Sequence, residues 1–270
     1  MLLIVQKLFE FWTDLDRNHS HPLSQYPLVK NPLSIVALTA LYLLFVQKWG
    51  PNMMKKRKPC HLRRIIIIYN GLQIAINAFI FLGISRIFFR RYNLKCQPVD
   101  YSVTPETIQL ARICYLYCLL KVFDFMDTVF FVLRKKDAQM SFLHRYHHAI
   151  MAVFCSLLFK FVPNSHFVLL AIVNSFVHVV MYAYYELTAL NPNTRRHLWW
   201  KKHLTQLQIL QFGIIGIHLI SALIVDCGLP KFLLISFLIQ TLFMVLMFSE
   251  FYYKNYIVKK RKTSERITEK

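Results

Sequence analysis

The chain has 270 residues, of which 56% are hydrophobic, and its mean hydropathy is +0.39. This composition excludes an ordinary soluble domain and predicts an integral membrane protein. Lysine and arginine number 33 against 13 acidic residues, but they gather in short loops without a nucleic-acid reading module, so we interpret them as membrane anchors and expect no nucleic-acid partner.

Seven segments are apolar over roughly 18 to 25 residues, the length that crosses a lipid bilayer. They cover residues 32–48, 65–89, 111–133, 145–162, 166–187, 204–225 and 230–253. No internal repeat or second soluble domain is visible. We therefore expect an all-α polytopic membrane protein, with residues 1–270 forming one domain of seven transmembrane helices.

Charge predicts the orientation of these helices. The loops after the first, third and fifth segments and the tail after the seventh are rich in lysine and arginine, whereas the opposite loops carry few. Because such charges accumulate on the cytoplasmic side, residues 1–31 are expected to be luminal and the basic tail 259–270 cytosolic. Cys96 and Cys227 are then the only cysteines in luminal loops, and we predict that they form a disulfide.

The third segment carries charged groups at membrane depth, where an ionisable group needs a partner or a cavity. Lys121 and Asp124 lie three residues apart and can neutralise one another, with Asp127 and Thr128 beside them. The pair could hold a histidine in one tautomer, or it could only lock helices together.

The fourth segment opens with three histidines in five residues. On a helix, His144, His147 and His148 share one face, which suits metal binding, acid–base catalysis or nucleophilic attack. The alternative is a set of helix-end histidines that reach the membrane surface.

Further polar residues follow in the fifth and sixth segments. Asn174, His178 and Tyr182 share a face by their spacing, while Gln208 and Gln211 are three residues apart. An interfacial tyrosine belt does not explain Asn174 or His178, although glutamines also join packed transmembrane helices without further function.

Hairpin geometry places several of these residues at one depth. Midpoints between Asp127 and His147, His147 and His178, and His178 and Gln208 all fall in predicted turns. If successive helices pack together, the four side chains form one layer about 6 to 20 Å inside the cytosolic surface.

Four motifs in this order resemble the ELO family of fatty acid elongases over nearly the whole chain. The motifs are Lys-x-x-x-x-x-Asp-Thr at 121–128, His-x-x-His-His at 144–148, Asn-x-x-x-His-x-x-Met-Tyr-x-Tyr-Tyr at 174–185 and Thr-Gln-Leu-Gln-x-x-Gln at 205–211. One departure is Asp124, where the family usually has the longer glutamate, so this carboxylate reaches one methylene less far.

The resemblance implies a condensing enzyme that joins a long-chain acyl-CoA with malonyl-CoA and gives 3-oxoacyl-CoA, CO2 and CoA without a cofactor or metal. It implies helices that enclose an acyl tunnel open to the cytosol, in the membrane of the endoplasmic reticulum. A homodimer, and association with other enzymes of the elongation cycle, are compatible with it.

The resemblance also suggests roles for the polar residues. His147 is the expected nucleophile, passing through an acyl-imidazole, with His178 facing it and His144 and His148 orienting groups or exchanging protons. The carboxylates are expected to fix histidine tautomers. Side chains expected to contact substrate are Lys121, Asn174, Tyr182, Gln208, Gln211, Arg134, Lys135 and Lys202.

Two other classes of protein remain as alternatives. Membrane di-iron desaturases and hydroxylases also use His-x-x-His-His, but they need more histidine ligands than this one box and His178. A lipid transporter or channel could use the polar layer as a gate, yet inverted repeats and broken spans are not evident.

Overall fold

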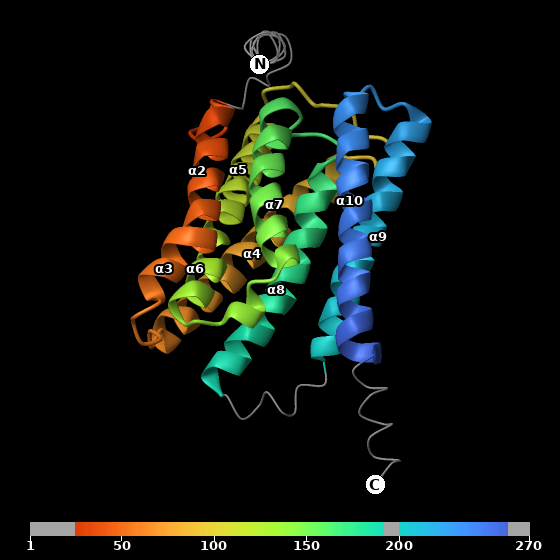
Figure 1. The fold of residues 1–270 in the computed structure, drawn as a ribbon. Helices are drawn as coiled ribbons and strands as arrows, with labels where there is room; N and C mark the ends of the chain where they lie inside the picture. The colour runs from red at the N-terminus through yellow and green to blue at the C-terminus, as the bar shows by residue number, and fades with distance from the viewer. Residues whose placement is uncertain (1–24, 192–199, 259–270) are drawn as a thin grey trace, which may run out of the picture.

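The computed structural model describes residues 25–191 and 200–258, and all regular structure in these two stretches is helical (Figure 1). The basic tail 259–270 and most of the predicted luminal segment, residues 1–24, lie outside this described part. The predicted all-α class is therefore confirmed for the part of the chain that the structure covers.

The first apolar segment is not one uniform helix. α2 (Pro32–Leu44) begins at Asn31, whose side chain accepts a hydrogen bond from the backbone of Leu33 at 3.0 Å. A π-helical turn (Phe45–Trp49) and the short α3 (Gly50–Met54) follow, and Pro51 lacks the N–H that a continuous ladder needs. A Cβ at Gly50 would lie 2.7 Å from Val132 Cγ1, so glycine permits close packing here.

Seven further helices complete the bundle. They are α4 (Arg63–Arg91), α5 (Pro105–Phe123), α6 (Phe125–Leu133), α7 (Phe142–Phe161), α8 (Val168–Leu190), α9 (Lys201–Val225) and α10 (Lys231–Tyr252). The loops 92–104, 162–167 and 226–230 meet at one end, which we call the disulfide end, and the loops 55–62 and 134–141 lie at the opposite end (Figure 1).

Helices that are neighbours in the sequence are not always neighbours in space. α8 packs along α4, whereas α7 packs against α2 and α5, and α9 pairs with α10. The hairpin argument assumed that α7 and α8 pack together, and these two helices are not main partners in the structure. Polar residues of α4 therefore reach the interior in addition to those of the predicted layer.

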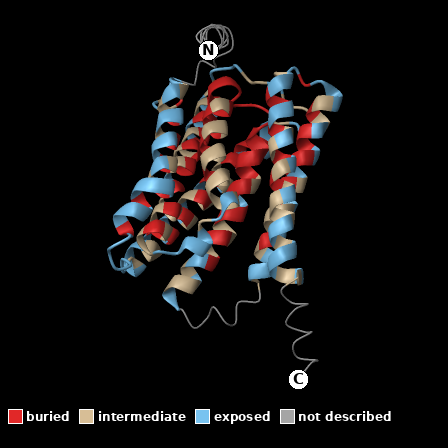
Figure 2. Ribbon diagram, in the orientation of Figure 1, coloured by how far each residue is buried: buried red, intermediate tan, exposed pale blue. Residues whose placement is uncertain are grey.

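Five segments of the described chain are long and apolar enough to cross a membrane: Pro32–Met54, Arg63–Arg91, Val168–Leu190, Lys201–Val225 and Lys231–Val258. The predicted spans at α5–α6 and α7 are not among them, because a break divides the former and charged or histidine side chains lower the hydropathy of both. Buried residues face inward while the outer faces of α2 and α10 are exposed (Figure 2). This pattern indicates a multi-pass membrane protein.

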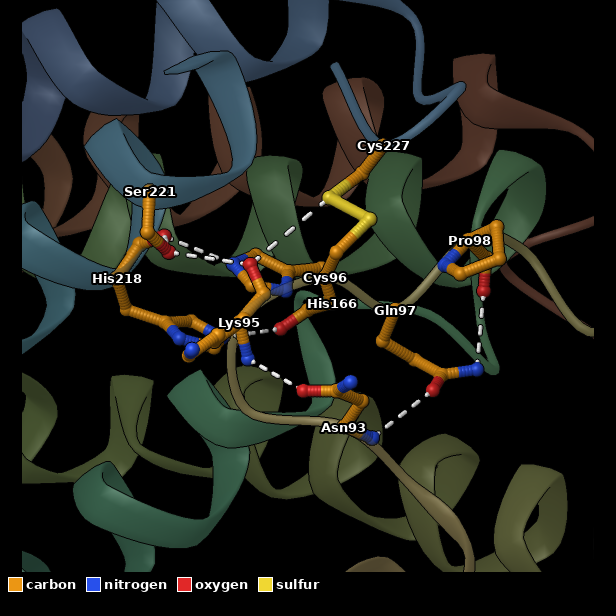
Figure 3. The surroundings of a disulfide bond; sticks show 9 residues. All are labelled: Asn93, Lys95, Cys96, Gln97, Pro98, His166, His218, Ser221 and Cys227. Atoms are coloured by element: carbon orange, nitrogen blue, oxygen red, sulfur yellow. Dashed lines mark hydrogen bonds between the residues drawn. A yellow bond between two sulfur atoms is a disulfide. The ribbon is translucent and has the colours of Figure 1, made fainter. Parts of the chain in front are cut away.

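A disulfide joins Cys96, which follows α4, to Cys227, which follows α9, with their Cα atoms 5.4 Å apart (Figure 3). The disulfide predicted from the sequence is therefore confirmed. Backbone hydrogen bonds hold the third loop of this end as well, since His166 N donates to Gln97 O at 2.9 Å and Asp100 N to Asn164 O at 2.9 Å.

Two histidines fasten the same end from within. The rings of His166 and His218 stack with their centroids 3.5 Å apart. The Nε2 of each ring donates to the backbone carbonyl of the other residue, at 2.8 and 2.9 Å (Figure 3). The α7–α8 loop is thereby bound to the C-terminal part of α9.

Candidate active site

A buried ion pair forms the centre of the site. Lys121 Nζ donates to Asp124 Oδ2 at 2.9 Å and to Asn174 Oδ1 at 3.0 Å, and both charged side chains are almost fully buried. Burying two charges is tolerable when each finds an opposite charge and further hydrogen bonds. The departure from glutamate to aspartate thus still leaves a carboxylate within reach of the lysine.

The helix breaks at this aspartate. α5 ends at Phe123 and α6 begins at Phe125, and the N–H of Asp124 is shared between the carbonyls of Leu120 and Val122. The break lies between Lys121 and Asp127, so the spacing of one continuous helix, which the sequence argument assumed, does not describe their relative positions.

α4 contributes polar partners that sequence reasoning did not assign to the site. Gln73 Nε2 donates to Asp124 Oδ1 at 2.8 Å and to Tyr69 Oη at 2.9 Å, and Asn77 Nδ2 donates to Gln73 Oε1 at 3.1 Å. The available signal was the presence of two amide side chains inside an apolar segment, where a polar group needs a partner.

α8 brings a histidine against the ion pair. His178 Nδ1 lies 3.5 Å from Lys121 Nζ, and an ammonium can only donate, so Nδ1 is the acceptor and Nε2 carries the ring proton. Asp124 Oδ2 is 4.0 Å from the same nitrogen, beyond hydrogen-bond distance. Lysine rather than aspartate therefore sets the tautomer of His178.

The second carboxylate of this region has a different partner. Tyr182 donates to Asp127 Oδ2 at 2.7 Å, and Tyr117 donates to Asn174 Oδ1 at 2.8 Å. Neither Asp124 nor Asp127 hydrogen-bonds a described histidine. The described side chains that hydrogen-bond His178 and His144 are instead Lys121 and a threonine of α6, and only the lysine, which cannot accept, selects a tautomer.

That threonine, Thr128, follows Asp127 on α6 and contacts one of the three histidines of α7. Thr128 Oγ1 lies 2.9 Å from His144 Nε2 and 2.8 Å from Tyr42 Oη, which fixes the ring of His144. The ring of His148 lies 4.3 Å from that of His144 and 5.7 Å from that of His147, measured between centroids.

His147 and His148 differ from His144, whose ring is bonded to Thr128. The ring of His147 lies 6.3 Å from those of Phe212 and Phe248, and it makes no hydrogen bond to a described residue. The ring of His148 lies close to both of its neighbours, so the three rings of α7 form one cluster. An imidazole with apolar neighbours and unoccupied nitrogens is available to react with a bound molecule.

Other expected site residues lie apart from this network. Gln208 Nε2 contacts Met181 Sδ at 3.6 Å, and Gln211 is buried with no described partner for its Oε1. Arg134 and Lys135 directly follow α6 at the opposite end, and Lys202 lies over Tyr252 in the first turn of α9. The basic residues could meet only a part of a substrate outside the bundle core.

A narrow apolar cavity of about 40 Å³ lies between α5, α7 and α8. The cavity is lined by Tyr117, Cys118, Met151 and Cys155, and it continues to Pro163 at the disulfide end. Tyr117 connects the cavity to the site, because its hydroxyl donates to Asn174. In the described chain, no three histidine, cysteine or acidic side chains are grouped to hold a metal ion.

Comparison with known proteins gives one consistent result. The sequence model of the ELO family, described as GNS1/SUR4, matches residues 27–264. A very long chain fatty acid elongase of Aedes aegypti is 38% identical over 264 residues, covering 97% of this chain and 74% of its own length. Very long chain fatty acid elongase 7 of Drosophila melanogaster is 38% identical, covering 92% and 77%. Elongase 1 of Mus musculus is 36% identical, covering 90% and 88%.

Proposed function

The chain belongs to the ELO family, and from this membership we propose that it is a condensing enzyme of fatty acid elongation. Its substrates are a long-chain acyl-CoA and malonyl-CoA, and its products are 3-oxoacyl-CoA, CO2 and CoA. The single observation that supports this chemistry is the placement of His147, which has no described hydrogen bond and lies among aromatic rings in a cluster with His144 and His148.

The first half of the reaction is acyl transfer to His147. A ring nitrogen attacks the thioester carbonyl, the carbon–sulfur bond breaks, and the CoA thiolate leaves with the ring proton as free CoA. An acyl-imidazole is more electrophilic than the thioester that formed it. Phe212 and Phe248 keep the ring in an apolar environment, where the neutral, nucleophilic form of imidazole is favoured.

The second half is decarboxylative condensation. Loss of CO2 from malonyl-CoA leaves the bonding electron pair on its C2, which attacks the acyl carbon and displaces the ring of His147. That ring takes up one proton and returns to its neutral state. His178 Nε2–H, set by Lys121, is suited to donate a hydrogen bond to the thioester oxygen, where charge develops.

The remaining site residues act by position. Thr128 holds His144 beside His148, which together can meet the malonyl carboxylate or pass a proton. Gln73 and Asn174 keep the ion pair of Lys121 in one arrangement. The step as written transfers no hydride, so we expect no nicotinamide cofactor, and it needs no metal.

We place the acyl chain along the apolar cavity between α5, α7 and α8, which widens into a tunnel when occupied. CoA then lies at the opposite end, near Lys135 and Lys202.

We further propose seven spans in the membrane of the endoplasmic reticulum, with α5–α6 and α7 crossing inside the bundle. The disulfide end is then luminal and the C-terminus cytosolic. A homodimer is compatible with this arrangement.

The reaction is tested with purified protein, radiolabelled malonyl-CoA and a panel of acyl-CoA primers of increasing length. We expect labelled 3-oxoacyl-CoA and labelled CO2 in equal amounts without reductant, and no loss of rate when a chelator is added. His147→Ala should lower the rate by about 100-fold or more. His61→Ala, an exposed histidine in the loop before α4, is the matched control and should keep full activity.

The intermediate is tested separately by omitting malonyl-CoA. An acyl-CoA alone should then release CoA once per active site and leave an acyl adduct, which peptide mass spectrometry should locate on His147. An adduct on another residue, or product formation without any adduct, would contradict the proposed nucleophile while leaving the overall reaction intact.

A further inference from the structure

A second hollow of the molecule lies away from the candidate active site. It is a groove of about 640 Å³ between the final turns of α4 and the first turns of α5, near the disulfide end. None of its lining residues belongs to the network around Lys121. Its walls combine apolar side chains with three arginines, which the proposed reaction does not use.

The groove changes character along its length. Phe79 and Leu82 are 56% and 64% exposed at its inner part, and the exposed Arg86 and Arg90 follow on the same face of α4. From Phe79 to Arg90 the helix rises about 16 Å, at 1.5 Å per residue. This is the depth of one leaflet, since the hydrocarbon core of a bilayer is about 30 Å thick.

The charge of the groove is only partly compensated. Arg91 Nη1 lies 3.5 Å from Glu106 Oε2 and donates to Thr104 Oγ1 at 3.2 Å. The guanidinium groups of Arg86 and Arg90 form neither an ion pair nor a hydrogen bond with a residue that the structure describes. Two neighbouring positive charges therefore remain available to an anion.

At the opposite end of α4, by contrast, Arg63 has a structural role. Arg63 donates through Nε to Ala189 O at 3.0 Å and through Nη2 to Leu190 O at 2.7 Å, so it binds the last carbonyls of α8. Interaction with the negative end of the α4 dipole accounts for Arg90 and Arg91 in the last turn. It does not account for Arg86, which lies more than a turn earlier, next to apolar side chains.

We propose that this groove binds an anionic phospholipid of the surrounding leaflet. The phosphate sits between Arg86 and Arg90, whose guanidinium groups suit phosphate oxygens, and one acyl chain lies against Phe79 and Leu82. A lipid fits both parts of the groove, whereas a free phosphate would use only the arginines. The inference does not rest on the proposed reaction.

The experiment places the full-length protein in nanodiscs of phosphatidylserine and phosphatidylcholine in equal amounts. Native mass spectrometry then counts the lipid molecules that stay bound to the protein after it is released from the nanodisc. We expect phosphatidylserine to be retained preferentially, and Arg86→Gln/Arg90→Gln to lower its retention by about thirtyfold, since each charge near the surface contributes roughly a factor of five.

Matched controls separate this site from general attraction. Lys58→Gln/Arg64→Gln removes two exposed charges at the opposite end and should leave retention unchanged. Phe79→Ser/Leu82→Ser should also weaken lipid retention, and soluble glycerol phosphate should not displace the lipid. A thermal unfolding scan verifies that each variant is folded.

Several outcomes would overturn the proposal. They are equal retention of the two lipids, equal loss in both charge variants, unchanged retention in the Phe79 and Leu82 variant, and displacement by glycerol phosphate. Loss of a dimer in Arg86→Gln/Arg90→Gln without any change in bound lipid would assign the groove to a second copy of the chain instead.

Discussion

Two pairs of histidines in this protein differ in what their nitrogens touch. At the disulfide end, His166 and His218 each give a ring proton to the other's backbone carbonyl, so the pair holds a loop to a helix. In the candidate active site, His178 faces a lysine and His147 meets only aromatic rings. The two pairs thus differ in their partners, which supports a structural role for the first pair and agrees with the catalytic role proposed for the second.

The largest expected effect is on catalysis. Replacing His178 by asparagine keeps an acceptor for Lys121 but removes the Nε2–H, so the condensation rate should fall by about 100- to 10,000-fold. The melting temperature should change little. Labelled malonyl-CoA incorporation per folded molecule measures this effect, and a variant that retains more than a tenth of the rate would contradict the role assigned to His178.

Breaking the buried ion pair should mainly affect folding. Lys121→Met leaves Asp124 without its cation, which lowers the free energy of unfolding by about 3 to 5 kcal/mol. Lys121→Met/Asp124→Asn removes both charges and should recover part of the stability but none of the activity. Detergent-based thermal unfolding is the measurement, with Lys202→Met, at an exposed position, as the control.

The histidine pair of the disulfide end should show the opposite behaviour to His178. His166→Ala/His218→Ala loses two hydrogen bonds and should lower the free energy of unfolding by about 2 kcal/mol, while turnover per folded molecule stays unchanged. A loss of turnover without a loss of stability would contradict the structural role of His166 and His218.

The same variant carries a pH test. His166 lies in the loop between α7 and α8, outside the spanning segments, and burial lowers its pKa. Its contribution to stability is therefore present at neutral pH and is lost as the pH falls below about 6.5, the pKa of an unfolded histidine. The decrease in melting temperature on acidification should be smaller in the variant than in the unmodified protein.

The smallest effect is expected at Thr128. Thr128→Val keeps the shape of the side chain but removes the hydrogen bond to His144 and to Tyr42. If this hydrogen bond stabilises the oriented ring of His144 by about 1 kcal/mol, its loss should lower the rate roughly fivefold. Thr128→Ser, which retains the hydroxyl, is the matched control and should recover most of the rate.

Sequence patterns predicted the helical class, the position of most helices and several members of the buried polar network. Lys121 and Asp124 were expected to pair from their spacing, and they do. What spacing could not supply is the partner helix. Gln73 reaches Asp124 because α4 packs on α5 as well as on α8, and which side chains meet across two helices depends on three-dimensional packing rather than on periodicity.

The helix break at Asp124 is likewise not predictable from the sequence. The segment 111–133 reads as one apolar span, because Phe123 and Phe125 on either side give no local signal such as proline or glycine. Only the shared hydrogen bond of the Asp124 N–H reveals the turn. The locations of Arg134, Lys135 and Lys202 around a substrate stay predictions, because they lie apart from the described network.

The bond between Cys96 and Cys227 closes a covalent ring, since 131 positions separate the two residues. Lys121, His147 and His178 all lie inside that ring, whereas α2, α4 and α10 lie outside it. A protease that nicks the chain between α8 and α9 would leave both fragments attached, so they would migrate as one band on a gel until a reductant is added.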